Sequence, residues 1–240
     1  LDDEDPRVRE HAVRLSERLA NANSKLREKL LAMADDDNLR VRYQLAFSLG
    51  EVGDPRVAAA LAKILKHDGG DRWIRLAVFS SLAEGAGRVF AELAADQPWR
   101  TSPPGRDILQ ELTRYLGRQN ERKELAPVLA VLESLPAEEI ATSAAIVRGL
   151  GEGMARQKGT FEQKLAAIGS DRAVEILRGM LATARTTATD ESRPTGDRVE
   201  AIRLLALDSF ARCGEALAAL VSNRQPQEIQ SPALGTLGGV

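Results

Sequence analysis

The chain has 240 residues and a formal net charge of −2, with 28% charged and 43% hydrophobic residues. These proportions are ordinary for a folded globular protein. The near-neutral balance argues against a dedicated nucleic-acid binder, whose affinity depends on clustered Lys and Arg meeting phosphates. The one cysteine, Cys213, permits neither an intrachain disulfide nor a thiolate metal cluster, and no apolar run is long enough to span a membrane.

A short motif repeats along the chain. An Arg-Val-Arg tripeptide at residues 7–9 recurs at residues 40–42 and, changed to Arg-Trp-Ile-Arg, at residues 72–75. A period of 33 residues is typical of a helical-repeat solenoid, in which each unit is a pair of helices. The aliphatic residues that continue this register are Val8, Val41, Ile74, Ile108, Ile140, Val199 and Ile229. The long step between the fifth and the sixth of them predicts an irregular insertion, which we place at residues 155–197.

The second unit carries the signals that start and end its helices. Asp37 can cap the first helix by accepting a hydrogen bond from a free backbone N–H group. Glycines between residues 50 and 53 can end that helix, and Asp54-Pro55 can start the next one, with Pro in its first turn. Between these signals lies an apolar stripe with helical spacing: Val41, Leu45 and Leu49.

The same signals predict the other elements in chain order. Asp5-Pro6 starts the first unit, and the proline-containing segment 96–105 and the polar segment 186–196 are predicted to be loops. The other predicted helices cover residues 24–34, 72–84, 87–95, 106–118, 121–134, 136–150, 161–168 and 214–222, with a sixth unit that starts near residue 197 and a partial seventh at 224–240. No alternating strand pattern is present, so the sequence predicts an all-α protein.

The units predict one domain over residues 1–240, an α-solenoid of about six helical hairpins in a right-handed superhelix. One hairpin buries too little apolar area to offset its ordering entropy, so each unit needs the apolar stripe of a neighbour. Because the chain opens with Leu1 rather than Met and stops soon after a helix begins, we expect it to be part of a longer protein.

Particular stretches resemble a known family. DPRVR at residues 5–9, LRVRYQLAFSLGE at 39–51 and GDPRV at 53–57 resemble HEAT repeats. Together with residues 73–81 and 224–230, they look like the HEAT segment of large exported bacterial proteins. In those proteins a sorbosone- or glucose-dehydrogenase-like β-propeller precedes the repeats, and a c-type cytochrome domain follows them.

This resemblance implies a connector between an oxidoreductase domain and a haem domain, located in the periplasm or cell envelope. Without the resemblance, the cytoplasm is the expected compartment. The chain departs from the whole-protein pattern because Cys213 is followed by Gly-Glu-Ala-Leu and not by a haem-binding Cys-x-x-Cys-His motif, and it has no propeller signature.

Arg9, Arg42 and Arg75 share one register position, and two roles are open to them. They can line a groove that binds an acidic partner, or each can bond a capping Asp or a carbonyl of the adjacent unit and so form a structural ladder. We expect the ladder, because the resemblance to HEAT repeats implies an Arg in this role and because a fork of donors suits bridging.

Other residues that can carry chemistry are expected to be structural. His11 and His67 are too far apart in the repeat order for a catalytic triad or a two-His metal site. The acidic runs at 2–5 and 35–37 lack the spacing of a calcium loop and fit helix capping. The glycines of 149–153 are predicted to end a helix with left-handed turns. We therefore expect no catalytic residue, no metal and no cofactor.

A partner surface is expected on the second helices, which usually line the concave face of such a solenoid. Trp99 lies in a proline-bounded segment, where it can dock on a partner or pack across the end of its own unit. Trp73 is expected to be a core or inter-helix residue. The candidate partner-binding residues are Arg56, Lys63, Arg88, Trp99 and Arg122.

The function that we expect is a non-catalytic scaffold whose partners are proteins or neighbouring domains of the same parent chain, with no nucleic acid and no membrane span. The alternative is an enzyme of HEAT-like build, such as a bilin lyase or a DNA glycosylase. The glycosylase needs a strongly basic face and a catalytic Asp, and the net charge of −2 disfavours it.

Overall fold

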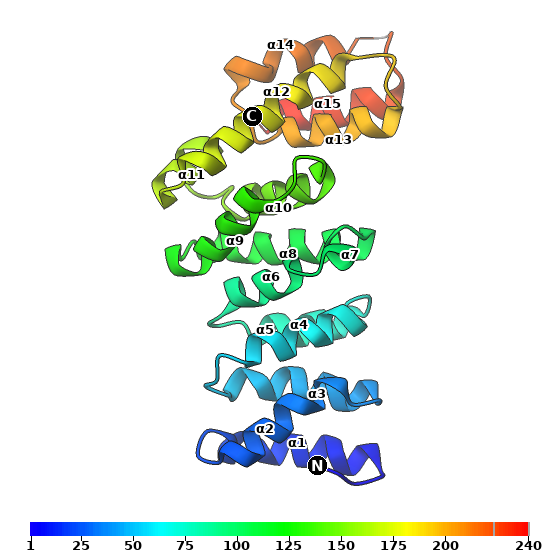
Figure 1. The fold of residues 1–240 in the computed structure, drawn as a ribbon. Helices are drawn as coiled ribbons and strands as arrows, with labels where there is room; N and C mark the ends of the chain where they lie inside the picture. Colours follow the sequence, from blue (N-terminus) through cyan, green and yellow to red (C-terminus); the bar gives the residue numbers. More distant parts are fainter. Residues whose placement is uncertain (223, 240) are drawn as a thin grey trace.

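The computed structural model describes residues 1–222 and 224–239. In these residues the regular elements are fifteen α-helices and two short 3₁₀ helices, and none of these residues lies in a strand. Figure 1 shows the helices stacked one above another, from the N-terminal end in blue to the C-terminal end in red. The predicted all-α solenoid is therefore confirmed. Of the predicted seventh unit, Val240 lies outside the described residues.

Two parallel series of helices build the stack. Within the first series, α1 packs on α3, α3 on α5, α8 on α10, and α13 on α15. An ion pair from Arg148 to Glu200, 2.7 Å long, joins α10 to α13. The helices of the first series are α1 (Pro6–Ala20), α3 (Leu39–Ser48), α5 (Arg72–Ser80), α8 (Pro103–Gln119), α10 (Ile140–Gly153), α13 (Thr195–Leu205) and α15 (Gln227–Leu237).

The second series lies alongside, with α4 packed on α6, α6 on α9, α9 on α12, and α12 on α14. Two short helices, α7 (Gln97–Arg100) and α11 (Phe161–Ile168), stand outside both series, and the 3₁₀ helices η1 (Met33–Asp35) and η2 (Leu49–Glu51) follow α2 and α3. The helices of the second series are α2 (Ser24–Ala32), α4 (Val57–Asp68), α6 (Ala86–Ala94), α9 (Arg122–Ser134), α12 (Asp171–Thr189) and α14 (Phe210–Leu220).

Side-chain caps explain where the first helices begin. Asp5 and Asp71 accept hydrogen bonds from backbone N–H groups of α1 and α5, and the start at Asp5 agrees with the sequence prediction. The cap of α3 is Asn38, whose side-chain oxygen accepts from the N–H group of Arg40 at 3.0 Å. The prediction of Asp37 is therefore wrong by one residue, because the amide oxygen of Asn38 is the acceptor that reaches the first turn.

The segment 96–105, predicted to be a loop, is largely helical. Asp96 caps α7, and Ser102 caps α8, which begins at Pro103. The loop prediction is wrong because Pro is tolerated in the first turn of a helix, where its missing N–H group has no intrahelical acceptor. The prolines of this segment start helices instead of interrupting them.

The polar segment 186–196 is also shorter as a loop than predicted. α12 continues to Thr189 and α13 begins at Thr195. Ala184 and Ala188 are buried and extend the apolar side of α12. The hydroxyl of Thr189 donates to a carbonyl one turn back, so the polar side chain is satisfied within the helix. The helix therefore persists through residues that a composition argument assigns to a loop.

The surplus residues of the fifth unit form an additional helix. α11 has the bounds that the sequence predicted, and a capping box between Thr160 and Gln163 starts it. Gly169 ends it with a φ of 98°, a left-handed conformation that favours glycine. α12 then serves as the long second helix of this unit.

The repeat register places equivalent residues in the core for part of the chain. Val41 and Ile74 are each the third residue of their helix and are fully buried. Val8 holds the same position in α1 but is 47% exposed, because no described helix covers that side of α1. Ile140 is 62% exposed at the first residue of α10, so its prediction as a core anchor is wrong.

Trp73 is not in the core, and that prediction is wrong too. Its side chain is 55% exposed, and the guanidinium of Arg72 lies 5.1 Å from its ring centroid. Successive helix residues point about 100° apart, so the inward direction of the buried Ile74 turns Trp73 toward solvent.

The glycine-rich segment 149–153 lies inside α10 with right-handed backbone, so the prediction of left-handed turns there is wrong. Gly149 and Gly153 let α10 approach α8 closely. A Cβ atom added to Gly149 would lie 2.0 Å from the Oγ1 atom of Thr113 and 2.3 Å from the carbonyl oxygen of Gln110. The absence of a side chain is therefore what this helix contact requires.

Candidate functional site

Three arginines form the same structure along the stack, which we call the arginine clamp. In each clamp the Nε and Nη2 atoms donate to the two oxygens of one carboxylate, and Nη1 donates to a carbonyl six residues earlier in the chain. This paired geometry adds orientation as well as energy. The clamps are Arg9 with Asp36, Arg42 with Asp68, and Arg100 with Glu139.

The first two clamps are linked through Asp36. Its carboxylate accepts from Arg9 at 2.8 and 2.9 Å, and its backbone carbonyl accepts from Arg42. The carboxylate also accepts from the N–H group of Asn38, the cap of α3. Asp36 thus ties the end of the first unit to the first helix of the second.

The most buried clamp is that of Arg42. Its side chain is 5% exposed, and it donates to Asp68 at 2.6 and 2.8 Å. An arginine in this position must keep a partner, because an unpaired buried charge is costly. This clamp is therefore structural, and its guanidinium has little surface left for an external ligand.

Arg75, the third residue of the predicted ladder, makes a different contact. Its Nη1 atom donates to the Oε2 atom of Glu111 at 3.1 Å, and both side chains are partly exposed. Near the C-terminal end, the buried Arg198 also binds a side chain and a backbone carbonyl, but not in the geometry of the clamps. Its Nη2 donates to the side-chain oxygen of Gln225 at 2.7 Å, and its Nε donates to the carbonyl of Ala188 at 3.0 Å.

The clamps shift the pKa values of their carboxyl groups. Burial raises the pKa of Asp36 and Asp68, but hydrogen bonds and positive charge from the clamping arginines outweigh it, and both pKa values are lowered. At Glu139 the hydrogen bond from Arg100 is the largest cause, and the pKa is lowered as well. The folded state therefore favours the ionised form of all three groups.

Lowered pKa values predict a loss of stability in acid. A carboxyl group whose folded pKa lies below its unfolded value of about 4 stabilises the protein above that pH and stops doing so as the pH falls through the folded pKa. Thermal unfolding followed by circular dichroism should give a Tm at about pH 3 well below that at about pH 7. The Asp68→Asn variant should have a weaker acid dependence, and an unchanged Tm across this pH range would contradict the prediction.

The five candidate partner-binding residues are spread from the start of α4 to the start of α9. Arg56 donates to Asp54 at 2.9 Å, Lys63 pairs with Asp35, and Trp99 is half-buried against the core. Arg88 and Arg122 are exposed and line two separate shallow hollows. Within the described residues, Arg88 and Arg122 are thus the cations of the set that have no ion pair, and Trp99 is partly buried against the core.

Ion pairs also take up much of the basic character that the sequence places on the second helices. Lys29 pairs with Asp2, and Lys66 pairs with Asp96 at 3.0 Å. Like the Lys63 pair, the Lys66 pair joins neighbouring units, because Asp96 follows α6 whereas Lys66 lies on α4. The surface is therefore mixed in charge rather than uniformly basic.

The histidines and the cysteine lie apart from one another. His11 is exposed on α1, and His67 at the end of α4 contacts Asp68 at 2.9 Å. Cys213 is fully buried in α14, and burial raises the pKa of its thiol. Among residues 1–222 and 224–239, no three His, Cys, Asp or Glu side chains are grouped as metal ligands, and no helix is long and apolar enough to cross a membrane.

Sequence reasoning missed Arg100, Glu139 and the two carboxylates of the first clamps. Asp36 follows Arg9 by 27 residues and Asp68 follows Arg42 by 26, which is a usable signal for the linked pair. Glu139 follows Arg100 by 39 residues, so that signal fails once the unit length changes.

Comparison with known proteins agrees with the first part of this architecture. Residues 1–83 match the family model for HEAT repeats, a stretch that covers the first two units and α5. No curated protein and no solved structure matches the chain. HEAT repeats generally mediate protein–protein interactions. The first two units and α5 are thus similar to HEAT repeats, and the chain is an all-α helical solenoid.

Proposed function

We propose that the chain is a non-catalytic scaffold that binds a protein or a neighbouring domain through the exposed side of its second helices. The observation that carries this proposal is the way in which the charged side chains are paired. The Arg42 clamp reaches the first unit through the backbone carbonyl of Asp36, and the lysine pairs connect consecutive units, so they stabilise an extended surface. Rigid support of this kind suits recognition over several units.

Arg88 and Arg122 are the residues that we assign to partner contact. Both are exposed, and neither has an ion pair within the described part of the chain. They lie on α6 and α9, which pack together. An acidic surface on the partner would complement them, because charge complementarity guides encounter and orientation.

From the resemblance to exported bacterial proteins, we further propose that the partner is a flanking domain of the parent chain and that this chain connects a dehydrogenase-like domain to a c-type cytochrome domain. The coding sequence on either side tests this. An export signal and a propeller upstream, with a Cys-x-x-Cys-His motif downstream, are the expected result. A gene without these features would refute the connector role and leave the scaffold role open.

The scaffold role has its own binding test. The full chain and the segments encoded beside it would be produced separately and titrated by calorimetry. The double variant Arg88→Glu/Arg122→Glu should bind about ten-fold more weakly or worse. The control Arg193→Glu/Arg203→Glu makes the same charge change on exposed residues of another part of the stack. Equal losses in both variants would show only a general charge effect and would contradict the assigned surface.

A further inference from the structure

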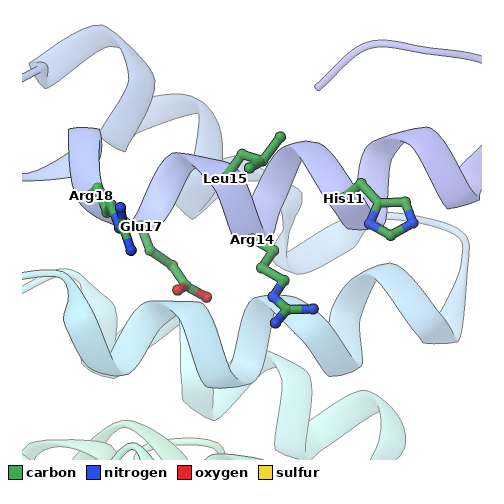
Figure 2. Close-up of a pocket in the computed structure, with 5 residues that line it drawn as sticks. All are labelled: His11, Arg14, Leu15, Glu17 and Arg18. Atoms are coloured by element: carbon green, nitrogen blue, oxygen red, sulfur yellow. The ribbon is translucent and has the colours of Figure 1, made fainter.

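The outer side of α1 exposes an apolar stripe formed by Val8, Leu15 and Leu19. Their spacing of seven and four residues places them along one side of the helix. Leu15 is 75% exposed and Leu19 is 60% exposed. Leu15 is the most exposed large hydrophobic side chain among the described residues. Figure 2 shows Leu15 pointing away from the helix below, toward which Glu17 points.

The repeat register shows what this side of the helix does in the next two units. Ser48 and Ser81 take the position of Leu15, at steps of 33 residues. The hydroxyl of Ser48 donates to Glu17 of the preceding unit at 2.7 Å, and that of Ser81 donates to the carbonyl of Ala46 at 2.7 Å. This is therefore the side by which a unit packs on the unit before it, and on α1 it is uncovered.

Basic side chains without an ion pair lie on the same helix as the exposed stripe. Arg7, His11 and Arg18 make no side-chain hydrogen bond or ion pair with any residue that the structure describes. The residue in the position of Arg7 one unit later is Arg40, which pairs with Glu10 of the preceding helix at 3.1 Å. By analogy with this internal contact, a helix that covers α1 would present carboxylates to these basic side chains.

The covering helix is not a further regular unit. Between the second and third units the approach is so close that a Cβ atom on Gly50 would lie 2.8 Å from the Oγ atom of Ser81. Leu15 and Leu19 are too large for that spacing, because overpacking a close contact costs stability. A partner on α1 must lie farther away and offer small or apolar side chains between which the leucines can insert.

We propose that this stripe, together with Arg7, His11 and Arg18, is a docking site for an acidic amphipathic helix of a partner protein. The proposal rests on the scaffold function and assigns to it a second surface, at the N-terminal end of the stack. A second copy of the chain is a poorer occupant. α1 against α1 opposes like charges, and α15 at the other end carries a single carboxylate, Glu228.

A synthetic helical peptide of about 18 residues, with Leu and Ala on one face and Glu on both flanks, is the probe. Fluorescence anisotropy with the full chain should show saturable binding. A peptide with Lys in place of Glu should bind at least about ten-fold more weakly. The Leu15→Glu/Leu19→Glu variant should lose binding to the same extent. Leu76→Glu is the control, because Leu76 is also an exposed leucine but lies on α5 and not on α1, and this variant should bind normally.

The remaining outcomes each overturn the proposal. Equal binding of the acidic and the basic peptides, or binding that survives the Leu15→Glu/Leu19→Glu change, would exclude an acidic helix at this site. If the free chain dimerises, the Leu15→Glu/Leu19→Glu change abolishes the dimer and no peptide binds, the stripe is assigned to a second copy of the chain. Binding to phosphatidylserine-containing vesicles in place of peptide would assign it to a lipid surface. Arg88 and Arg122 lie on other units. The calorimetric titration that tests the scaffold function can therefore fail or succeed independently of the peptide-binding experiment.

Discussion

Asp68→Ala should lower the free energy of unfolding by about 3 kcal/mol or more, because it leaves the buried guanidinium of Arg42 without its carboxylate. Removing one member of a buried pair costs more than the pair itself contributes, since the remaining charge has lost both its partner and water. Urea unfolding followed by circular dichroism measures the change. Asp68→Asn keeps one acceptor oxygen and should be less destabilising.

Two controls make this test specific. Arg172→Ala removes one member of an ion pair whose side chains are both well exposed, and it should change stability by less than about 1 kcal/mol. The double variant Arg42→Met/Asp68→Leu removes both charges and should recover part of the loss. A loss after Asp68→Ala no larger than that after Arg172→Ala would show that the Arg42 clamp does not stabilise the fold.

Gly149→Ala should destabilise the protein by about 3 kcal/mol, because the added Cβ atom would collide with the backbone of α8. The nearest backbone atom is the carbonyl oxygen of Gln110, at 2.3 Å, and a carbonyl inside a helix cannot move aside alone. Gly153→Ala should behave similarly, since its Cβ would lie 2.4 Å from the carbonyl oxygen of Arg114. The change should appear as a lower urea midpoint.

The matched substitution is Gly179→Ala in α12. This glycine is helical and exposed, and an added Cβ atom meets nothing within 4 Å. The variant should be more stable by about 0.5–1 kcal/mol, because Ala restricts the unfolded chain and favours the helix. If Gly149→Ala were also neutral or stabilising, the close contact of α8 with α10 would not exist in solution.

Charge patterns at the surface were only partly predictable. The sequence identifies which residues are basic, and it correctly puts Lys63, Arg88 and Arg122 on second helices. It does not reveal that Lys63 pairs with Asp35 of the unit before it, whereas Arg88 and Arg122 have no ion pair among the described residues. Such pairs join residues that are far apart along the chain, so they depend on how the units are stacked.

The sequence by itself determined the all-α class, the 33-residue period and several helix starts, because caps such as Asp5 and Asp71 act through neighbouring backbone groups. These signals act between residues that are close in the sequence, so they can be recognised without knowing which helices pack together. The same local reasoning failed for Trp73, since apolar composition does not say which side of a helix will be covered.

Only the tertiary structure decided which arginine meets which carboxylate and why the glycines of α10 are there. Arg100 reaches Glu139 across a unit boundary, and Gly149 is set against a neighbouring helix rather than a turn. Both depend on the distance between stacked helices, which side-chain packing fixes and which no stretch of sequence encodes alone. For the same reason, the exposed stripe on α1 is recognisable only once its counterparts in the following units are seen to be covered.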